Sequence, residues 1–486
     1  MILLAALLAT TTVVPTQQGN VRGEVTEDGR HLFRGIPYAA APIGPLRWKP
    51  PQPVRRWTRM RDATKSAASC PQVDRGWNTQ AASFASEDCL YLEVATPAPK
   101  PDTPLPVMVW IHGGSNYAGS GAGTIQSGMV RKGVVLVSIQ YRLGALGFLS
   151  HPALTREGGG ASGNYGLMDQ QAALRWVRAN IAAFGGDPTN VTLFGESAGA
   201  MDVGLHLLSP GSRGLFTKAI EESGTPGFGT PPRSLAENER LGTLIAASAG
   251  IPQTAAALRA LPVDKLIAAT EAIEVPGLAD KSFIWLQAIV DGRVLPETPA
   301  ATLAKGGNPA ALIIGSNARE LTLHGGVARA GDAIGEAFGS NARAARRAYG
   351  IDAIPAADPR MGDLSLILSN DITFRCPVTV VAAARARAGQ PVWQYQFDYS
   401  APDAKPVTHG SEIRYVMTSA QDLEAGAPPL QAYWLAFART GDPNAAGLPT
   451  WKRYDLAARS YLGFVNGGPQ PGNDLRSDVC DLRSAP

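Results

Sequence analysis

Short apolar runs alternate along this chain with longer segments in which apolar residues recur at helical spacing. Residues 107–111, 134–139, 191–194 and 311–315 are apolar or β-branched and have the composition of buried strands. Residues 169–183 carry apolar side chains every three or four positions, which is typical of a helix. Fully apolar strands that alternate with helices predict an α/β fold with a mostly parallel sheet covered by helices on both faces.

The pattern shows no internal repeat and no low-complexity linker. The chain of 486 residues is long for one domain, yet large α/β enzymes reach this length as a single unit. Residues 234–272 are alanine-rich and helix-prone, and we expect them to pack over the carboxyl edge of the sheet. We therefore expect a single domain over residues 19–486.

The N-terminal residues 1–14 are largely apolar or small, and the chain turns polar at Gln17 and Gln18. This length is too short to span a bilayer but fits the hydrophobic region of a signal peptide. No Lys or Arg precedes the apolar run, so a cytoplasmic chain with an apolar N-terminus remains the alternative. We expect a signal peptide over residues 1–18 and a secreted or periplasmic protein. No later segment reaches 18 uninterrupted apolar residues, so we expect no membrane anchor.

Composition limits the function classes. With 45% hydrophobic and 17% charged residues, the chain can bury a large core. The net charge of +3 and the absence of long Lys/Arg runs argue against a nucleic-acid partner. The glycine-rich residues 157–163 lack the strand–turn–helix context of a nucleotide-binding loop, and we expect a mobile surface loop there. Nothing in the sequence calls for a cofactor.

The four cysteines are Cys70, Cys89, Cys376 and Cys480. An even count permits two disulfides, with three possible pairings. Free buried thiols are the alternative reading. We expect no metal site, because no C-x-x-C spacing occurs and the chain has only six histidines.

The candidate chemistry begins at the pentapeptide Gly195-Glu196-Ser197-Ala198-Gly199, directly after the apolar run 191–194. A G-x-S-x-G sequence between a strand and a helix places its serine on a sharp turn, and the flanking glycines permit the tight backbone. A serine hydroxyl becomes a good nucleophile only when a base and an orienting acid lie beside it.

Further motifs follow one another in order through most of the chain. They occupy residues 33–39, 42–48, 86–92, 110–114, 141–143, 147–149, 164–170, 184–188 and 195–200. With these motifs the chain resembles the type-B carboxylesterase and lipase family, which includes the cholinesterases, and in particular its bacterial para-nitrobenzyl-esterase-like members. The resemblance implies an α/β-hydrolase fold with helical insertions over the active site.

The resemblance also implies a catalytic triad of Ser197, Glu320 and His409, in the chain order of α/β-hydrolases. His409 lies in a segment similar to the family's histidine loop. Glu320 is the acid, although Leu321 replaces the glycine that usually follows it. Asp291 is the competing carboxylate, but its surroundings resemble a structural turn of the family.

Other site residues follow from the same resemblance. The oxyanion hole is expected from the backbone N–H groups of Gly114, Ser115 and Ala198, with Ser115 standing where many relatives have a third glycine. Glu196, Ser223 and Glu412 are expected in a polar cluster behind the histidine. There they either favour the imidazolium or only make structural hydrogen bonds. Candidate pocket walls are Trp77, Phe228, Trp285 and Leu321.

The resemblance suggests the pairings Cys70–Cys89 and Cys376–Cys480. It implies a serine carboxylesterase that forms an acyl-enzyme with a small-molecule ester and acts as a monomer or weak oligomer. Two alternatives stay open: an amide or lipid-ester hydrolase on the same scaffold, and a non-catalytic relative that acts in adhesion or binding.

Overall fold

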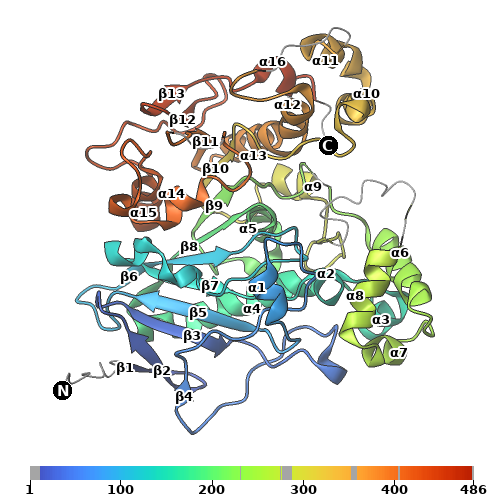
Figure 1. Ribbon diagram of the computed structural model, residues 1–486, viewed down its shortest axis with the longest axis vertical. Helices are drawn as coiled ribbons and strands as arrows, with labels where there is room; N and C mark the ends of the chain where they lie inside the picture. Colours follow the sequence, from blue (N-terminus) through green and yellow to red (C-terminus); the bar gives the residue numbers. More distant parts are fainter. Residues whose placement is uncertain are drawn as a thin grey trace, which may run out of the picture.

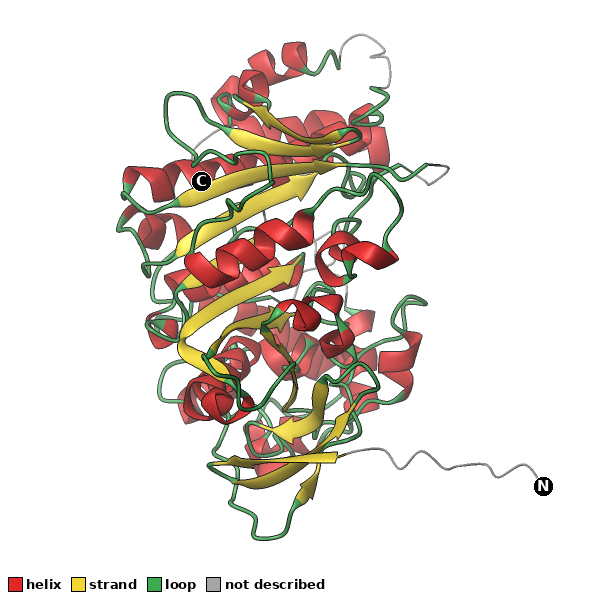
Figure 2. Ribbon diagram, turned by 90° about the vertical axis from the view of Figure 1, so that its left-hand side faces the viewer, coloured by secondary structure: helices red, strands yellow, loops and turns green. Residues whose placement is uncertain are grey.

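The computed structural model describes residues 11–229, 231–273, 275, 287–351, 358–402 and 406–483. One large twisted sheet runs through it, with helices on both faces (Figures 1 and 2). The strands are β1 (Thr11–Thr16), β2 (Gly19–Val25), β3 (His31–Pro37), β4 (Arg61–Asp62), β5 (Tyr91–Thr96), β6 (Leu105–Ile111), β7 (Val135–Ile139), β8 (Gly186–Glu196), β9 (Lys218–Glu222), β10 (Ala311–Asn317), β11 (Val392–Asp398), β12 (Tyr461–Val465) and β13 (Gly468–Gly472).

The helices occupy the segments between these strands. They are α1 (Thr79–Ser83), α2 (Gly144–Phe148), α3 (Pro152–Glu157), α4 (Tyr165–Asn180), α5 (Ala198–Leu208), α6 (Leu235–Ser248), α7 (Ala255–Ala260), α8 (Val263–Ala272), α9 (Pro299–Ala304), α10 (Ala330–Phe338), α11 (Ala342–Ala348), α12 (Leu364–Asn370), α13 (Cys376–Arg387), α14 (Ile413–Met417), α15 (Leu430–Thr440) and α16 (Ser477–Cys480).

The order of the strands shows a parallel centre between antiparallel edges. The order is β1-β2-β3-β5-β7-β6-β8-β9-β10-β11-β12-β13, with β4 on β2. Neighbouring strands from β7 through β12 pair in parallel, whereas β1, β2, β3 and β5 form an antiparallel run that ends on β7. The predicted α/β class with a mostly parallel sheet is confirmed, and all four strands predicted from apolar runs lie in the parallel part.

Both faces of the parallel centre are buried. On β6, Val109 and Ile111 join one core together with α4, α5 and α13, while Met108 and Trp110 join a second core with α14 and α15. Successive side chains of a strand point to opposite faces, so a strand covered on both sides must be apolar throughout. This burial explains why β6 shows no polar alternation.

The helix-prone residues 234–272 form α6, α7 and α8, which lie together with α3 at one side of the molecule (Figure 1). Helix α6 begins with a capping box, in which the Ser234 hydroxyl accepts from the Glu237 N–H and the Glu237 carboxylate accepts from the Ser234 N–H. Ile245, Leu258 and Leu266 attach the three helices to the larger core.

Part of the segment that is expected as a signal peptide pairs with the sheet. Residues 11–16 form β1, which pairs with β2 along its whole length, and Val14 is buried. An apolar strand and the hydrophobic region of a signal peptide have similar composition, so the sequence pattern did not separate them. A signal peptide over residues 1–18 stays a prediction.

The glycine-rich segment also differs from its prediction as a surface loop. Gly158, Gly159 and Gly160 are exposed, but the following residues 161–164 are buried. The buried part is held by hydrogen bonds, because the Ser150 hydroxyl donates to the Ser162 carbonyl and Asn164 Nδ2 donates to the Ile289 carbonyl. Only the first half of the segment is a surface loop.

A third core lies beside the C-terminal disulfide. Ile334, Phe338 and Leu368 pack there with Cys376 and Cys480.

In the described part of the chain, one helical stretch, Leu364–Arg387, has the length and mean hydropathy of a membrane span. Because 61% of its apolar 18-residue window is buried inside the protein, these two properties are weak evidence for a span.

Candidate active site

Ser197 lies on a strained turn between β8 and α5. Its backbone has φ 58° and ψ −125°, a combination that a non-glycine residue rarely adopts. A Cβ on Gly195 would lie 2.6 Å from the Ile111 carbonyl oxygen, and a Cβ on Gly199 would lie 2.2 Å from it. The turn therefore passes so close to β6 that both flanking positions require glycine. The Ser197 N–H donates to the Glu222 carbonyl, which ties the turn to β9.

The structure places Glu320 beside His409. The distance from Glu320 Oε2 to His409 Nδ1 is 2.6 Å, and both side chains are largely buried. Glu320 follows the end of β10, and His409 follows β11, the parallel neighbour of β10. The carboxyl ends of adjacent parallel strands share one edge of the sheet, which brings these two residues together across 89 positions of sequence.

The other imidazole nitrogen, Nε2, faces Glu196. It lies 3.3 Å from Glu196 Oε1, and no described residue forms a hydrogen bond with the Ser197 hydroxyl. A Cβ on Gly113 would lie 3.0 Å from Ser197 Cβ and 2.8 Å from Glu196 Oε2, so these three residues pack together. The predicted residues are thus gathered in one place, without a serine–histidine hydrogen bond; such bonds are often long in enzymes without substrate.

Glu320 is oriented by two asparagines. Its Oε1 accepts from the Asn317 N–H at 2.6 Å, and its N–H donates to Asn370 Oδ1 at 3.0 Å. Asp291, the competing carboxylate, instead accepts from the N–H groups of the three residues after Gly292 and closes a turn. This contact pattern gives Asp291 a structural place away from the histidine.

Asn317 also joins the polar cluster, and the sequence reading missed it. Its Nδ2 donates to Glu412 Oε2 at 2.6 Å, while Glu412 Oε1 accepts from the Ser223 hydroxyl at 2.8 Å. Glu412 and Ser223 thus bond to each other, and only Glu196 of the three predicted cluster residues contacts the imidazole. The position of Asn317 between Ser316 and the candidate acid was the only signal available for it.

The carboxylates govern the charge of His409. Burial disfavours its imidazolium, but Glu196, Glu320 and Glu412 outweigh burial and raise the pKa of His409. Burial, together with the neighbouring carboxylates, raises the pKa of Glu196 and of Glu412. Each negative charge near the imidazole stabilises the protonated histidine.

The expected oxyanion donors come from two elements. Gly114 and Ser115 lie in the loop after β6, and Ala198 is the first residue of α5. Among the described residues, the N–H groups of Gly114 and Ser115 have no acceptor, and the first N–H of a helix has no partner within the helix. Three unpaired N–H groups next to a serine fit the stabilisation of a negatively charged oxygen.

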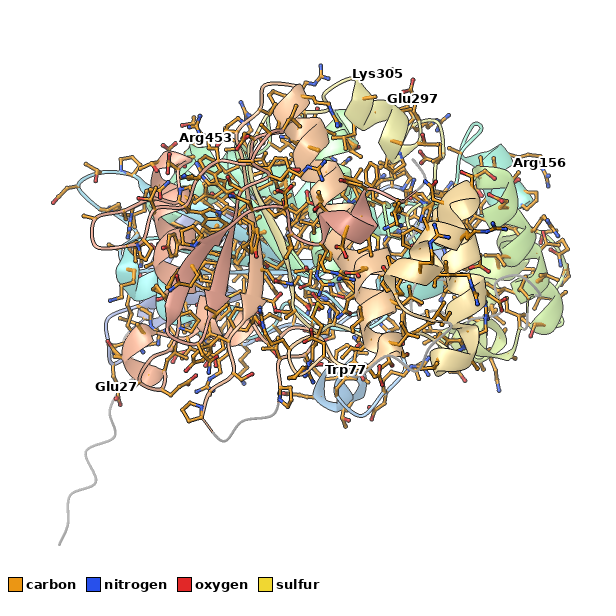
Figure 3. All side chains as sticks on the ribbon, turned by 90° about the horizontal axis from the view of Figure 1, so that it is seen from above. Glu27, Trp77, Arg156, Glu297, Lys305 and Arg453 are labelled. Carbon is orange, nitrogen blue, oxygen red and sulfur yellow. A yellow bond between two sulfur atoms is a disulfide. The ribbon has the colours of Figure 1, made fainter. Side chains whose placement is uncertain are left out.

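The four candidate wall residues have different surroundings. Trp77 is 64% exposed, lies at the periphery of the molecule in Figure 3, and comes within 3.0 Å of where a Cβ on Gly114 would stand. Phe228 is buried and Leu321 is half-buried. Trp285 lies outside the described residues. Another aromatic ring, Phe374, contacts the imidazole of His409 with ring centroids 5.3 Å apart.

Both expected disulfides are present. Cys70 is bonded to Cys89 and Cys376 to Cys480, and no cysteine in the described residues is free. Gln72, just after Cys70, donates to the Gly119 carbonyl and accepts from its N–H. The first disulfide loop is therefore attached to the segment that follows the expected oxyanion donors.

Comparisons with known proteins identify the family of the chain. The model of the carboxylesterase family matches residues 10–482. The chain is 36% identical to fumonisin B1 esterase of Sphingopyxis macrogoltabida, covering 90% of this chain and 84% of the relative. It is 34% identical to para-nitrobenzyl esterase of Bacillus subtilis, covering 93% and 94%.

Solved structures give the same result. A PNB esterase superposes with a TM-score of 0.83 at 31% identity, covering 97% of this chain and 100% of the other. The carboxylesterase of Geobacillus stearothermophilus superposes with a TM-score of 0.82, at the same identity and coverage. From the fold, the elbow serine and these matches, the chain belongs to the carboxylesterase family of α/β-hydrolases and is a carboxylic ester hydrolase.

Proposed function

We propose that the chain hydrolyses small-molecule carboxylic esters through an acyl-enzyme intermediate on Ser197. The observation that carries this proposal is the 2.6 Å contact between Glu320 and His409 beside a serine at a strand-to-helix elbow. Neutral His409 accepts the Ser197 proton while the serine oxygen attacks the ester carbonyl carbon.

The tetrahedral oxyanion then accepts hydrogen bonds from Gly114, Ser115 and Ala198. As the intermediate collapses, the imidazolium gives its proton to the leaving alcohol, and Ser197 remains acylated. Water repeats the sequence: His409 takes a water proton, hydroxide attacks the acyl carbon, and the serine oxygen leaves with that proton. The products are one carboxylic acid and one alcohol.

The carboxylates behind the histidine support this cycle, because they favour imidazolium and so stabilise the state in which it has taken the serine proton. Glu320 also fixes the ring orientation by accepting from Nδ1–H. That tautomer leaves Nε2 free to act as the base. When substrate enters, Nε2 exchanges its contact with Glu196 for a hydrogen bond from the Ser197 hydroxyl.

The test is covalent labelling. An organophosphate or sulfonyl fluoride should add to Ser197 with loss of activity, and peptide mapping identifies the modified residue. A panel of p-nitrophenyl and p-nitrobenzyl esters of graded acyl length would then define the substrate range. Labelling elsewhere, with full activity retained, would contradict the mechanism.

We further propose export from the cytoplasm. The two disulfides fit an oxidising compartment, where such bonds persist. Residues 1–18 are the proposed signal region. N-terminal sequencing of the protein recovered from the culture medium or periplasm tests this, and an intact residue 1 on cytoplasmic protein with four reduced thiols would contradict it.

A further inference from the structure

The loop that carries two of the oxyanion donors is held in an unfavourable backbone conformation. Gly114, Ser115 and Asn116 are consecutive and have φ values of 102°, 58° and 60°. Left-handed backbone disfavours residues with a Cβ, and two of these three have one. Such a conformation persists only where surrounding contacts hold it, so the contacts of this loop decide where its N–H groups point.

Asn116 supplies those contacts. Its side chain is fully buried, and its Nδ2 donates to Asp202 Oδ1 at 3.0 Å. Its Oδ1 accepts from the Tyr141 hydroxyl at 3.1 Å, and its carbonyl accepts from the Gly144 N–H at 2.7 Å. Three contacts from two other segments therefore hold this one residue next to Ser115.

Asp202 is held equally firmly. It is fully buried in α5, and its Oδ2 accepts from Gln170 Nε2 at 2.6 Å. Gln170 is oriented in turn by its bond to His206 Nε2 at 2.7 Å. Burial raises the pKa of Asp202 to about 7, which shows how poorly this position accommodates a charge. Both oxygens nevertheless accept from side-chain amide N–H groups. One belongs to Asn116 in the oxyanion loop, residues 114–116, and the other to Gln170 in α4.

The Asn116–Asp202 bond connects the two halves of the oxyanion hole. Ala198 begins α5, and Asp202 lies on the next turn of the same helix. Gly114 and Ser115 precede Asn116 directly. A shift of the loop relative to the helix would separate donors that must converge on one oxygen within hydrogen-bond distance.

We propose that Asn116 and Asp202 are positioning residues of ester hydrolysis, whose mutual hydrogen bond sets the oxyanion loop against the nucleophile helix. This inference rests on the proposed function, because it needs an oxyanion that forms at Ser197. Neither side chain touches the substrate. Their loss therefore weakens binding of the tetrahedral state more than binding of the ester.

The first test uses Asn116→Ala, Asp202→Ala and the double variant. Each single variant should lower kcat about 10–100-fold while KM changes by less than about threefold, because one set of oxyanion donors is displaced. The double variant should be no slower than the slower single variant, since each single variant already removes the same Asn116–Asp202 hydrogen bond. Affinity for a trifluoromethyl ketone, whose serine adduct carries an oxyanion, should fall with kcat.

A second series avoids cavities, because Asn and Asp have nearly equal volumes. Asn116→Asp places two carboxylates face to face and should lower kcat. The exchange N116D/D202N should restore it, since the amide introduced on α5 would then donate to the carboxylate introduced in the loop and accept from Gln170. Asp202→Asn alone should lower kcat less than Asn116→Asp, because the Asn116 amide can turn over, accept from the new amide and donate to the Tyr141 hydroxyl.

Glu221→Gln is the matched control. Glu221 is also a fully buried carboxylate, and its oxygens have no hydrogen-bond partner in the described part of the chain. This variant should leave kcat unchanged. Labelling of Ser197 by an organophosphate in each preparation separates failure of this inference from failure of the proposed function.

Three results would overturn the inference while Ser197 labelling persists. They are unchanged kcat in folded alanine variants, additive losses in the double variant, and failure of the N116D/D202N exchange to restore the rate lost in Asn116→Asp. If the alanine variants do not fold, the equal-volume series decides alone.

Discussion

The two sides of the candidate site are built in opposite ways. On one side, His409 lies among Glu196, Glu320 and Glu412, and charge determines its state. On the other side, the oxyanion loop is held by the neutral side chains of Asn116 and Tyr141 and by one buried carboxylate. Ser197 stands between these two sides, at the end of β8.

This difference separates two kinds of control. The histidine side has to bind and release a proton, and coupled carboxylates adjust the pKa of that step. The oxyanion side has to offer fixed N–H groups to a charge that exists only briefly, and rigid contacts serve this purpose. We therefore expect changes on the histidine side to alter the pH profile, and changes on the oxyanion side to alter kcat at every pH.

The largest effect should come from the residue between the two sides. Ser197→Ala should fold normally and lose about 10⁵–10⁶-fold in kcat, because neither side has a nucleophile to act on. Steady-state kinetics and the unfolding temperature, measured on one preparation, test this. Retention of a tenth of the activity would rule out Ser197 as the nucleophile.

Glu320→Gln tests the histidine side. The amide cannot hold Nδ1–H as the carboxylate does, so kcat should fall about 10³–10⁴-fold with little change in stability. The matched control is Asp291→Asn, since Asp291 is the carboxylate that closes a turn. That variant should lower the unfolding temperature and leave most of kcat; a well-folded but inactive Asp291→Asn would reverse the assignment of the acid.

Glu196→Gln should shift the pH profile. In the proposed mechanism activity requires neutral His409, whose pKa is raised, so kcat/KM should rise with pH through an apparent pKa above the ordinary histidine value of about 6.5. Removing the Glu196 charge destabilises the imidazolium, which lowers that apparent pKa by about one unit and extends activity toward acid pH. An unchanged or raised pKa in Glu196→Gln would contradict this electrostatic coupling.

Removal of the disulfides should have the smallest effect on activity. They close loops with sequence separations of 19 and 104, which correspond to about 3 and 5 kcal/mol of unfolded-state entropy. Replacing Cys376 and Cys480 by Ala should therefore destabilise more than replacing Cys70 and Cys89. Because Gln72 holds Gly119, only the Cys70 and Cys89 replacement should also lower kcat, by a few-fold. Thermal unfolding of the two double variants tests the predicted difference in stability, and their kcat values test the predicted difference in activity.

Local patterns determined much of this molecule. The apolar runs predicted β6, β7, β8 and β10, because a strand covered on both faces must be apolar throughout. The G-x-S-x-G sequence predicted the turn at Ser197, because the close approach to β6 excludes any side chain at its two glycines. The order of motifs indicated the family and which glutamate and histidine to examine.

Only the tertiary structure decided the partners of these residues. No spacing or composition distinguishes four of the positioning side chains, which are Asn317, Asn370, Asn116 and Asp202. Each forms hydrogen bonds with groups that strand order and helix packing bring near. The sequence also did not predict the antiparallel edge, because strand pairing joins segments that are far apart in sequence. It did not predict β1, because an apolar strand resembles a signal region in composition. The sequence by itself therefore indicated the candidate reacting groups, whereas long-range packing determined what holds them in place.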